Sequence, residues 1–165
     1  MGKKALYPGS FDPVTYGHIN IIKRASKIFS EVTIAVIENP EKKPVFSREK
    51  RSKILKECCR NFSGIKVDTY DGLTVEYAKS ISASVIIRGL RSVSDFEGEM
   101  QMAVMNKKMR KNLDTIFLMT DPEYAHISSS LVKEVAKYGG ELSHFVPDAS
   151  EAALQSKFHD ENFDC

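Results

Sequence analysis

One histidine in this chain stands between a segment typical of a strand and a segment typical of a helix. Residues 5–9 run from apolar side chains into a Pro-Gly pair, which indicates a strand that ends abruptly. Apolar residues then recur at helical spacing from Ile19 to Phe29, so His18 is expected in the first turn of a helix. Free backbone N–H groups and the helix dipole favour an anion at that place. His18 is therefore suited to chemistry on a phosphate group.

Segments typical of strands and helices alternate along the chain and would hold this histidine in place. The strand segments are short and rich in Val and Ile, with little polar alternation, as is typical of parallel strands covered on both faces. They are residues 4–7, 32–37, 65–70, 84–87 and 115–119. The helical segments are residues 17–29, 47–60, 74–81, 95–111 and 129–138, with a short helix expected around 150–158. This alternation predicts an α/β fold with a Rossmann-like, doubly wound, five-stranded parallel sheet. We expect a single domain over residues 1–158 and a C-terminal tail over residues 159–165.

The carboxyl ends of the expected strands carry most of the candidate residues. Doubly wound sheets bind ligands beyond those ends, where the strand order reverses. The histidine motif follows the first strand, Lys42 follows the second, and Arg88 and Arg91 follow the fourth. Basic side chains are thus concentrated at one rim of a chain whose net charge is only +2. This concentration predicts a ligand rich in phosphate, whereas the small net charge argues against binding to nucleic acid.

Composition and length define the class of protein. A chain of 165 residues with 28% charged and 42% hydrophobic residues is typical of one globular domain with its own core. No apolar run approaches the ~18 residues of a membrane span, and the first residues match neither a signal peptide nor a myristoylation motif. Three cysteines without a CxxC pair argue against a structural zinc site and favour a reducing, cytoplasmic location.

Several kinds of active site are disfavoured by motifs that the sequence lacks. It has no GxGxxG, GxxxxGK[ST] or GxSxG, which argues against a dinucleotide-dependent oxidoreductase, a P-loop NTPase and a serine hydrolase. Ser10 has no evident base partner apart from His18. Nucleotidyl transfer requires less, because an attacking phosphate is already an anion and catalysis consists of positioning and charge stabilisation. Basic side chains and helix starts are sufficient for it, with Mg²⁺ neutralising the polyphosphate.

At this point the motifs match a known family. The segment YPGSFDPVTYGH, residues 7–18, resembles the T/S-x-x-H…GH core of the nucleotidyltransferase superfamily, and the fuller pattern resembles the bacterial phosphopantetheine adenylyltransferases. The further segments that fit, in the expected order, are residues 42–46, 86–91, 95–100 and 127–134. The resemblance spans residues 3–158, nearly the whole chain.

The resemblance implies reversible transfer of the adenylyl group of ATP to 4′-phosphopantetheine. The products are dephospho-coenzyme A and pyrophosphate, and the reaction belongs to coenzyme A synthesis. The 4′-phosphate would attack the α-phosphorus of ATP in line, without an enzyme-bound intermediate. The resemblance further implies Mg²⁺ carried mainly on the ATP phosphates, feedback by coenzyme A, and assembly as a homo-hexamer.

The resemblance also assigns roles to individual residues. Catalytic roles are implied for His18, which would stabilise the pentacoordinate transition state, for Lys42, which would neutralise the substrate phosphate, and for Arg91, which would grip the nucleotide phosphates. The residues implied to bind ATP are Ser10, Phe11, His18, Gly89, Leu90, Arg91, Glu99, Tyr124, Ala125, His126, Ile127, Ser128, Ser129 and Ser130. The residues implied to bind phosphopantetheine are Ser10, Lys42, Leu73, Thr74 and Arg88. No set of metal ligands is expected.

Other functions stay open at the level of sequence. One is an enzyme of the same superfamily that transfers AMP or CMP to another phosphate acceptor, such as nicotinate mononucleotide. Another is a nucleotide-binding module without catalysis. An RNA-binding module is a third, which the length and the small net charge argue against.

Several candidate residues also have a structural interpretation. Arg88 and Arg91 could pair with Asp95 and Glu99 as an ionic network, although ligand contact is preferred. The serine run 128–130 could cap a helix and face a ligand at the same time.

Two of the expected helices have distinctive surfaces. The methionines at helical spacing in residues 95–111 are interpreted as core filling, and apolar residues on more than one face predict burial against both the sheet and a neighbouring subunit. The Lys- and Arg-rich helix, residues 47–60, is interpreted as a solvated face.

Overall fold

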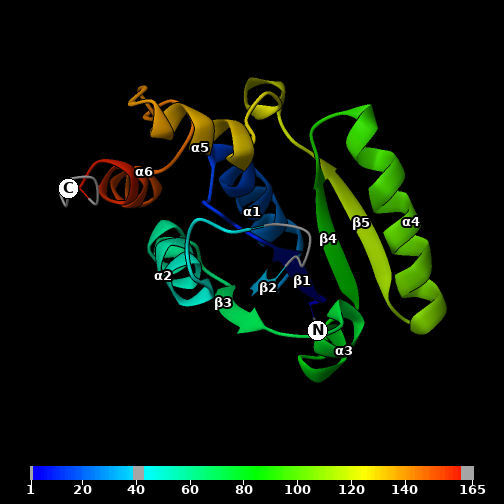
Figure 1. Ribbon diagram of the computed structural model, residues 1–165. Helices are drawn as coiled ribbons and strands as arrows, with labels where there is room; N and C mark the ends of the chain where they lie inside the picture. Colours follow the sequence, from blue (N-terminus) through cyan, green and yellow to red (C-terminus); the bar gives the residue numbers. More distant parts are fainter. Residues whose placement is uncertain (1, 39–42, 161–165) are drawn as a thin grey trace.

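The strand segments pair side by side in one parallel sheet in the computed structural model, which describes residues 2–38 and 43–160 (Figure 1). The strands are β1 (Lys4–Gly9), β2 (Glu31–Ile37), β3 (Ile65–Tyr70), β4 (Val85–Leu90) and β5 (Asp114–Met119). Their order is β3-β2-β1-β4-β5, and every pair is parallel. The order reverses between β1 and β4, where sheets of this type leave a crevice for ligands. The predicted five-stranded, doubly wound parallel sheet is confirmed.

Helices join the strands and cover the sheet. They are α1 (Tyr16–Ile28), α2 (Arg48–Cys59), α3 (Thr74–Ser80), α4 (Val93–Met109), α5 (Ser129–Lys137) and α6 (Asp148–Gln155). The short turn η1 (Pro122–Tyr124) precedes α5, and the turn η2 (Ser156–Asp160) follows α6. All the predicted elements are present, with differences at their ends. The most relevant difference is at β4. The sequence predicted that this strand ends at residue 87, but it continues to Leu90, so Arg88 and Gly89 belong to the strand.

Hydroxyl side chains define where four of these helices begin. Thr15, Ser47, Ser92 and Ser128 each accept a hydrogen bond from the backbone N–H three residues later. Such a cap satisfies one of the N–H groups that a helix start leaves unpaired. Because α1, α4 and α5 follow β1, β4 and β5, three of these caps bring a helix start to the carboxyl edge of the sheet.

Alternating side chains of the central strands fill a core on each face of the sheet. On one face, Ala5 and Tyr7 of β1 belong to a cluster shared with α1, α2, α5 and α6. On the other face, Leu6 packs with Val75 and Ala78 of α3. The central strands β1 and β2 are buried along most of their length, as the sequence predicted for strands covered on both faces.

The edge strand β3 is less covered than the sequence predicted. Its residues alternate between half-buried positions such as Ile65 and Val67 and exposed positions such as Lys66 and Asp68. The half-buried side chains pack against the larger core cluster. On the opposite face α3 covers only part of the strand, because its Tyr77 stacks on Tyr70 and donates to Asp68 while Lys66 stays exposed. The expectation of full coverage is therefore wrong for this strand.

Helix α4 lies alongside β4 and β5, away from the other helices (Figure 1). Of its 17 residues only Asn106 is fully buried. Met100, Met102, Met105 and Met109 expose between 45% and 57% of their surface. Their interpretation as core filling is wrong for the single chain, because the sheet contacts only one side of the helix. The expected burial against a neighbouring subunit stays a prediction.

Two features of the described residues relate to the expected cellular location: the composition of the helices and the state of the cysteines. Over residues 2–38 and 43–160, no helix combines the length and the apolar composition that crossing a lipid bilayer needs. Cys58 is half-buried, Cys59 is buried, and both are free. Burial raises the pKa of the Cys59 thiol to about 12, so this side chain stays protonated at neutral pH and acts as a small core residue.

Candidate active site

A cleft of about 660 Å³ opens at the carboxyl edge of the sheet. Its walls come from the ends of β1 and β4, the turn between β1 and α1, the starts of α1 and α5, and one side of α4. The sequence-predicted site residues that line it are Ser10, Phe11, His18, Thr74, Arg88, Gly89, Arg91, Ile127, Ser128, Ser129 and Ser130. Residues from distant parts of the chain therefore meet where the strand order reverses, as the sequence led us to expect.

His18 occupies the third position of α1 and is held there by its own helix cap. Its ring Nδ1 accepts a hydrogen bond from the Thr15 backbone N–H at 3.0 Å, while the Thr15 hydroxyl accepts one from the His18 N–H at 3.4 Å. A backbone N–H can only donate, so Nδ1 must be the unprotonated nitrogen. The proton of the neutral ring is thereby assigned to Nε2, which makes that atom a hydrogen-bond donor.

The surroundings of His18 keep its ring neutral. Burial lowers its pKa to about 4, and the nearby positive charges of Arg91 and Arg88 act in the same direction. At neutral pH the ring therefore carries no charge, and its Nε2–H group is a neutral donor. A neutral ring with Nδ1 already bonded has no free site for a proton, so His18 is poorly suited to act as a general base.

We expect the low pKa of His18 to be measurable in the free protein. In an NMR titration of the ring protons, the His18 midpoint should lie near pH 4, well below the ~6.5 of a solvated histidine. The unfolded chain binds this proton more readily than the folded protein does. Acid should therefore reduce the free energy of unfolding as the pH falls from about 6.5 toward 4. A midpoint at or above ~6.5 would contradict the neutral-donor assignment.

The start of α1 has fewer free N–H groups than the sequence suggested. The Tyr16 N–H donates to the Phe145 carbonyl at 3.0 Å, and the His18 N–H is taken by the Thr15 cap. The expectation that free N–H groups of this helix bind the anion is therefore largely wrong. The start of α5 is better suited to bind an anion. Its Ser128 cap accepts a hydrogen bond from the Leu131 N–H, and the serine run 128–130 lines the cleft.

The turn between β1 and α1 is held in an unusual backbone conformation. Phe11 has a φ of 47°, in the left-handed region that costs a bulky residue about 1–2 kcal/mol. The residue is 2% exposed, and its ring meets the Tyr7 ring edge-on at 5.4 Å and the His18 ring at 5.0 Å. Gly9 permits this packing, because a Cβ at that position would lie 3.0 Å from the Phe11 ring. Packing of the ring therefore holds Ser10 and Phe11 in the geometry that lines the cleft.

Arg88 is bound on both sides of its guanidinium group. Its Nε and one terminal nitrogen donate to the two oxygens of Glu99, each at 2.5 Å, and its other nitrogen donates to the Pro8 carbonyl at 2.9 Å. Burial works to lower the Arg88 pKa, but the hydrogen bond and charge of Glu99 outweigh it and the net pKa is raised. Glu99, expected from the resemblance to contact ATP, thus has both oxygens on Arg88.

Arg91 joins the end of β4 to the segment before α5. It contacts the Asp95 carboxylate at 3.2 and 3.3 Å, and one of its nitrogens donates to the Ile127 carbonyl at 3.3 Å. These contacts are longer than those of Arg88, and 40% of the side chain is exposed. Both arginines therefore belong to the ionic network that the sequence allowed, and both also line the cleft. The two interpretations are compatible.

Sequence reasoning missed two cations of the cleft wall. Lys133 of α5 lies 2.9 Å from the buried Asp12 carboxylate, and Arg51 of α2 is only 1% exposed. The interpretation of residues 47–60 as a solvated face is wrong at Arg51. A signal existed, because Arg51 precedes Ile54 and Leu55 by three and four positions and so shares their buried helix face.

Other predicted residues lie at the edge of the cleft or outside it. Leu73 is 60% exposed, and the Leu90 side chain is buried in the core. Tyr124 is half-buried, with its ring centroid 6.3 Å from that of Tyr16. Lys42 lies outside the described residues. Six predicted site residues within the described part of the chain do not line the cleft: Leu73, Leu90, Glu99, Tyr124, Ala125 and His126.

The charges that line the described cleft favour an anionic ligand. Its cations are Arg51, Arg88, Arg91 and Lys133, and its carboxylates are Asp12 and Glu38. Positive charge therefore exceeds negative charge, with His18 neutral. Within residues 2–38 and 43–160, no group of three or more His, Cys, Asp or Glu side chains could hold a metal ion.

Comparison with known proteins gives consistent family matches. The cytidylyltransferase-like family matches residues 6–135 of this chain. The phosphopantetheine adenylyltransferase of Caldanaerobacter subterraneus subsp. tengcongensis is 56% identical over 154 residues, which cover 93% of this chain and 96% of that protein. The phosphopantetheine adenylyltransferase of Finegoldia magna is 49% identical over 157 residues, which cover 95% of this chain and 97% of that protein.

Solved structures show the same fold at low sequence identity. The nicotinic acid mononucleotide adenylyltransferase of Plasmodium falciparum, solved as a complex with NaAD, matches with a TM-score of 0.68. The match covers 94% of this chain and 96% of that chain, with 16% sequence identity. It confirms the Rossmann-like fold and, at this identity, nothing about the substrate.

Proposed function

We propose adenylyl transfer for this site, because the chain belongs to the phosphopantetheine adenylyltransferase family. The enzyme transfers the adenylyl group of ATP to 4′-phosphopantetheine, and forms dephospho-coenzyme A and pyrophosphate in coenzyme A biosynthesis. The observation that carries the proposal is the meeting of a neutral His18, Arg88 and Arg91 in one cleft with the serine-rich start of α5.

One bond forms and one bond breaks in this reaction. An oxygen of the 4′-phosphate bonds to the α-phosphorus of ATP, and the bond from that phosphorus to the oxygen that bridges it to the β-phosphorus breaks on the opposite side. The attacking group is already an anion and pyrophosphate leaves as an anion, so no general base is required. The low pKa of His18 supports this scheme, because the ring has no role to play as a base.

His18 instead acts as a hydrogen-bond donor to the reacting phosphate. Its neutral Nε2–H group donates a hydrogen bond to the α-phosphate. This hydrogen bond strengthens as negative charge builds on the equatorial oxygens in the transition state. The Ser10 hydroxyl binds the same phosphates from the turn before α1. Arg91 grips the remaining nucleotide phosphates from the end of β4, with the Gly89–Leu90 backbone beside it.

The acceptor substrate is assigned to the other side of the cleft. Arg88 binds the phosphate of phosphopantetheine, with its guanidinium already oriented by Glu99 and the Pro8 carbonyl. Lys42, which lies outside the described residues, neutralises the same phosphate. Thr74 lines the cleft and borders the pantetheine arm, and the exposed Leu73 lies beside it in sequence.

The segment before α5 is proposed to hold the nucleotide. Ile127, Ser128, Ser129 and Ser130 line the cleft, and residues 124–126 precede them directly in sequence. The Arg91 contact with the Ile127 carbonyl ties this segment to the phosphate-binding end of β4. Glu99 is not included in the proposed ATP site, because both of its oxygens are bonded to Arg88, which is assigned to the acceptor substrate.

Magnesium enters the reaction with ATP. The cleft carboxylates do not fit a protein-held ion, because Asp12 is bonded to two backbone N–H groups and Lys133, and Glu38 is paired with Arg51. Mg²⁺ prefers free carboxylate oxygens and keeps several of its waters. We therefore propose that the metal arrives on the ATP phosphates, as MgATP, and that the basic side chains of the cleft complete the neutralisation.

A coupled assay of pyrophosphate release tests the proposed reaction. With MgATP and 4′-phosphopantetheine, we expect pyrophosphate and dephospho-coenzyme A in equal amounts. Nicotinate mononucleotide and an alcohol phosphate offered in parallel test the other acceptors of the superfamily. Turnover with one of these and none with phosphopantetheine would overturn the substrate assignment, and ATP binding without turnover on any acceptor would favour a non-catalytic module.

We also propose that the protein assembles as a homo-hexamer, is inhibited by coenzyme A and works in the cytoplasm. Support for assembly comes from the exposed apolar face of α4, since such a surface is rarely left in water by a monomer. Support for a reducing location comes from the free Cys58 and Cys59. Feedback is tested by adding coenzyme A to the assay and following the rate.

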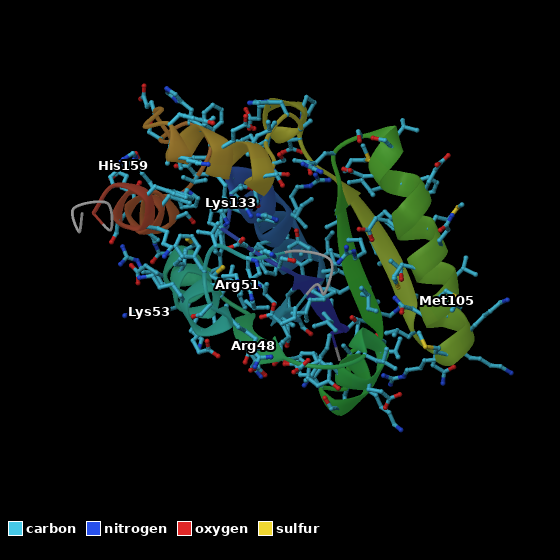
Figure 2. All side chains as sticks on the ribbon, viewed as in Figure 1. Arg48, Arg51, Lys53, Met105, Lys133 and His159 are labelled. Atoms are coloured by element: carbon cyan, nitrogen blue, oxygen red, sulfur yellow. The ribbon has the colours of Figure 1, made fainter. Side chains whose placement is uncertain are left out.

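Substitution of Met105 tests the role of the α4 face. Figure 2 shows Met105 on α4, and 55% of its surface is exposed in the single chain. Met105→Glu should place a charge in the proposed contact and shift the oligomer toward smaller species, measured by light scattering after gel filtration. Lys111→Glu, beyond the end of the helix, serves as a charge control and should leave the mass unchanged. A Met105→Glu variant of unchanged mass would argue against this face as the interface.

A further inference from the structure

Arg51 is a buried charge for which the reaction described above has no use. Its side chain is 1% exposed, although it belongs to a helix whose other basic residues lie mostly in solvent. Figure 2 shows Arg51 on the side of α2 that faces the sheet and Lys53 on the opposite side. Burying a guanidinium is costly unless its donors are satisfied, so the bonds that it makes indicate what it is for.

Among the residues that the structure describes, the hydrogen-bond partners of Arg51 lie in the turn before α1 and in the segment before α2. One terminal nitrogen donates to the Ser10 carbonyl at 2.9 Å, and Nε donates to the Phe46 carbonyl at 3.0 Å. The other terminal nitrogen donates to Glu38 at 2.5 Å. One planar group therefore ties the Ser10 turn to both ends of the segment from Glu38 to Phe46.

Asp12 makes the complementary connection from the other side. Its carboxylate accepts hydrogen bonds from the Val45 N–H at 2.9 Å and the Phe46 N–H at 3.1 Å. Phe46 is thus held by its N–H on Asp12 and by its carbonyl on Arg51. The Ser10 turn and the segment before α2 are consequently locked to each other by backbone contacts from two buried charged groups.

The bond to the Ser10 carbonyl determines which way the next N–H group points. The Ser10–Phe11 peptide is trans, and the C=O and N–H of a trans peptide point in opposite directions. With the carbonyl held against Arg51, the Phe11 N–H must point away from α2. Ser10 and Phe11 both line the cleft, where a backbone N–H group can donate to an anion.

We propose that Arg51 is a positioning residue for the nucleotide, which orients the Ser10–Phe11 peptide so that the Phe11 N–H donates to a phosphate oxygen of ATP. The inference rests on the proposed function, since it takes ATP as the ligand of this cleft. Lysine cannot replace the group, because its ammonium is a compact point charge and lacks the planar fork that reaches three acceptors in fixed directions.

Binding of ATP, measured without any acceptor substrate, tests the inference separately from the reaction. Calorimetric titration with MgATP should give a Kd for Arg51→Lys at least ~10-fold above that of the wild type, as expected when a charge-assisted bond no longer aligns the donor. The stoichiometry per folded chain should stay unchanged. Lys53→Met, on the solvent side of the same helix, is the matched control and should bind ATP within about twofold of the wild type.

Steady-state kinetics separate positioning from a merely structural role. A misaligned peptide raises the KM for ATP in parallel with the Kd, whereas partial unfolding lowers the apparent kcat and the binding stoichiometry and leaves both constants as they were. Arg51→Lys with a wild-type Kd and KM for ATP would overturn the inference. A wild type that binds ATP but releases no pyrophosphate with phosphopantetheine would overturn the proposed function instead, and the calorimetric comparison would still decide the role of Arg51.

A measurement on the wild type covers the case in which no Arg51 variant folds. In a ¹H–¹⁵N NMR spectrum, the Phe11 amide resonance should shift when MgATP is added, because the phosphate accepts from that N–H. The Val45 amide, already bonded to Asp12, should shift far less. A Phe11 resonance that does not respond to saturating MgATP would contradict the inference regardless of the variants.

Discussion

Replacement of His18 by alanine is expected to lower the turnover number by at least ~10²-fold, the usual effect of removing one donor that stabilises transition-state charge. Affinity for ATP should change little, because the Nε2–H bond strengthens only as charge builds on the α-phosphate. The measurements are kcat from pyrophosphate release and Kd for MgATP from calorimetry. A kcat within about threefold of the wild type, roughly the effect of one weak contact, would remove His18 from the mechanism.

A glutamine variant distinguishes a hydrogen-bond donor from a general base at position 18. His18→Gln keeps an N–H donor of similar reach but has no titratable group, so it should retain more activity than His18→Ala. If His18 worked as a base, His18→Gln and His18→Ala would be equally inactive. His144→Ala is the control for loss of a histidine. The His144 side chain is exposed, and its ion-pair partner within the described residues is Glu141.

Replacement of Arg88 by methionine is expected to reduce kcat/KM for phosphopantetheine by about 10²-fold, since it removes a charged partner of the substrate phosphate. It should also destabilise the fold, because Glu99 would be left partly buried without its partner. The two side chains are 30% and 21% exposed, so partial solvation limits that cost to about 1–3 kcal/mol. Kinetics with both substrates and urea unfolding provide the two readouts.

A double variant distinguishes ligand binding from the ionic network. Arg88→Met with Glu99→Met removes both charges, so no buried carboxylate is left unpaired and much of the stability should return. The KM for phosphopantetheine should stay high, because the phosphate still lacks its cation. Recovery of both stability and KM would show that Arg88 has only a structural role and would overturn its assignment to the substrate.

Much of the fold could be predicted because its signals are local. The alternation of short Val- and Ile-rich segments with helical periodicity predicted five strands in one parallel sheet. The apolar residues after His18 placed that histidine in the first turn of α1, where the structure has it. Boundaries were less accurate, as at β4, since strand ends depend on hydrogen bonds to neighbouring strands.

The neighbourhood of the site could also be predicted, for a topological reason. Parallel strands bring their carboxyl ends to one edge of the sheet, so Ser10, His18, Arg88 and Arg91 had to approach each other once the strands were identified. Full-length similarity to curated relatives then specified the reaction, which the residues alone had left open between several acceptors.

Only the tertiary structure decided how these groups are paired and charged. Lys133 meets Asp12 across 121 positions of sequence, and Asp12 meets Phe46 across 34. No local pattern encodes such contacts, because they depend on which elements the strand order places side by side. The neutral state of His18 likewise depends on burial and on the two arginines nearby. The sequence by itself determined the elements and the edge where the site lies, and packing between distant elements decided which cations of the site are paired and whether His18 is charged.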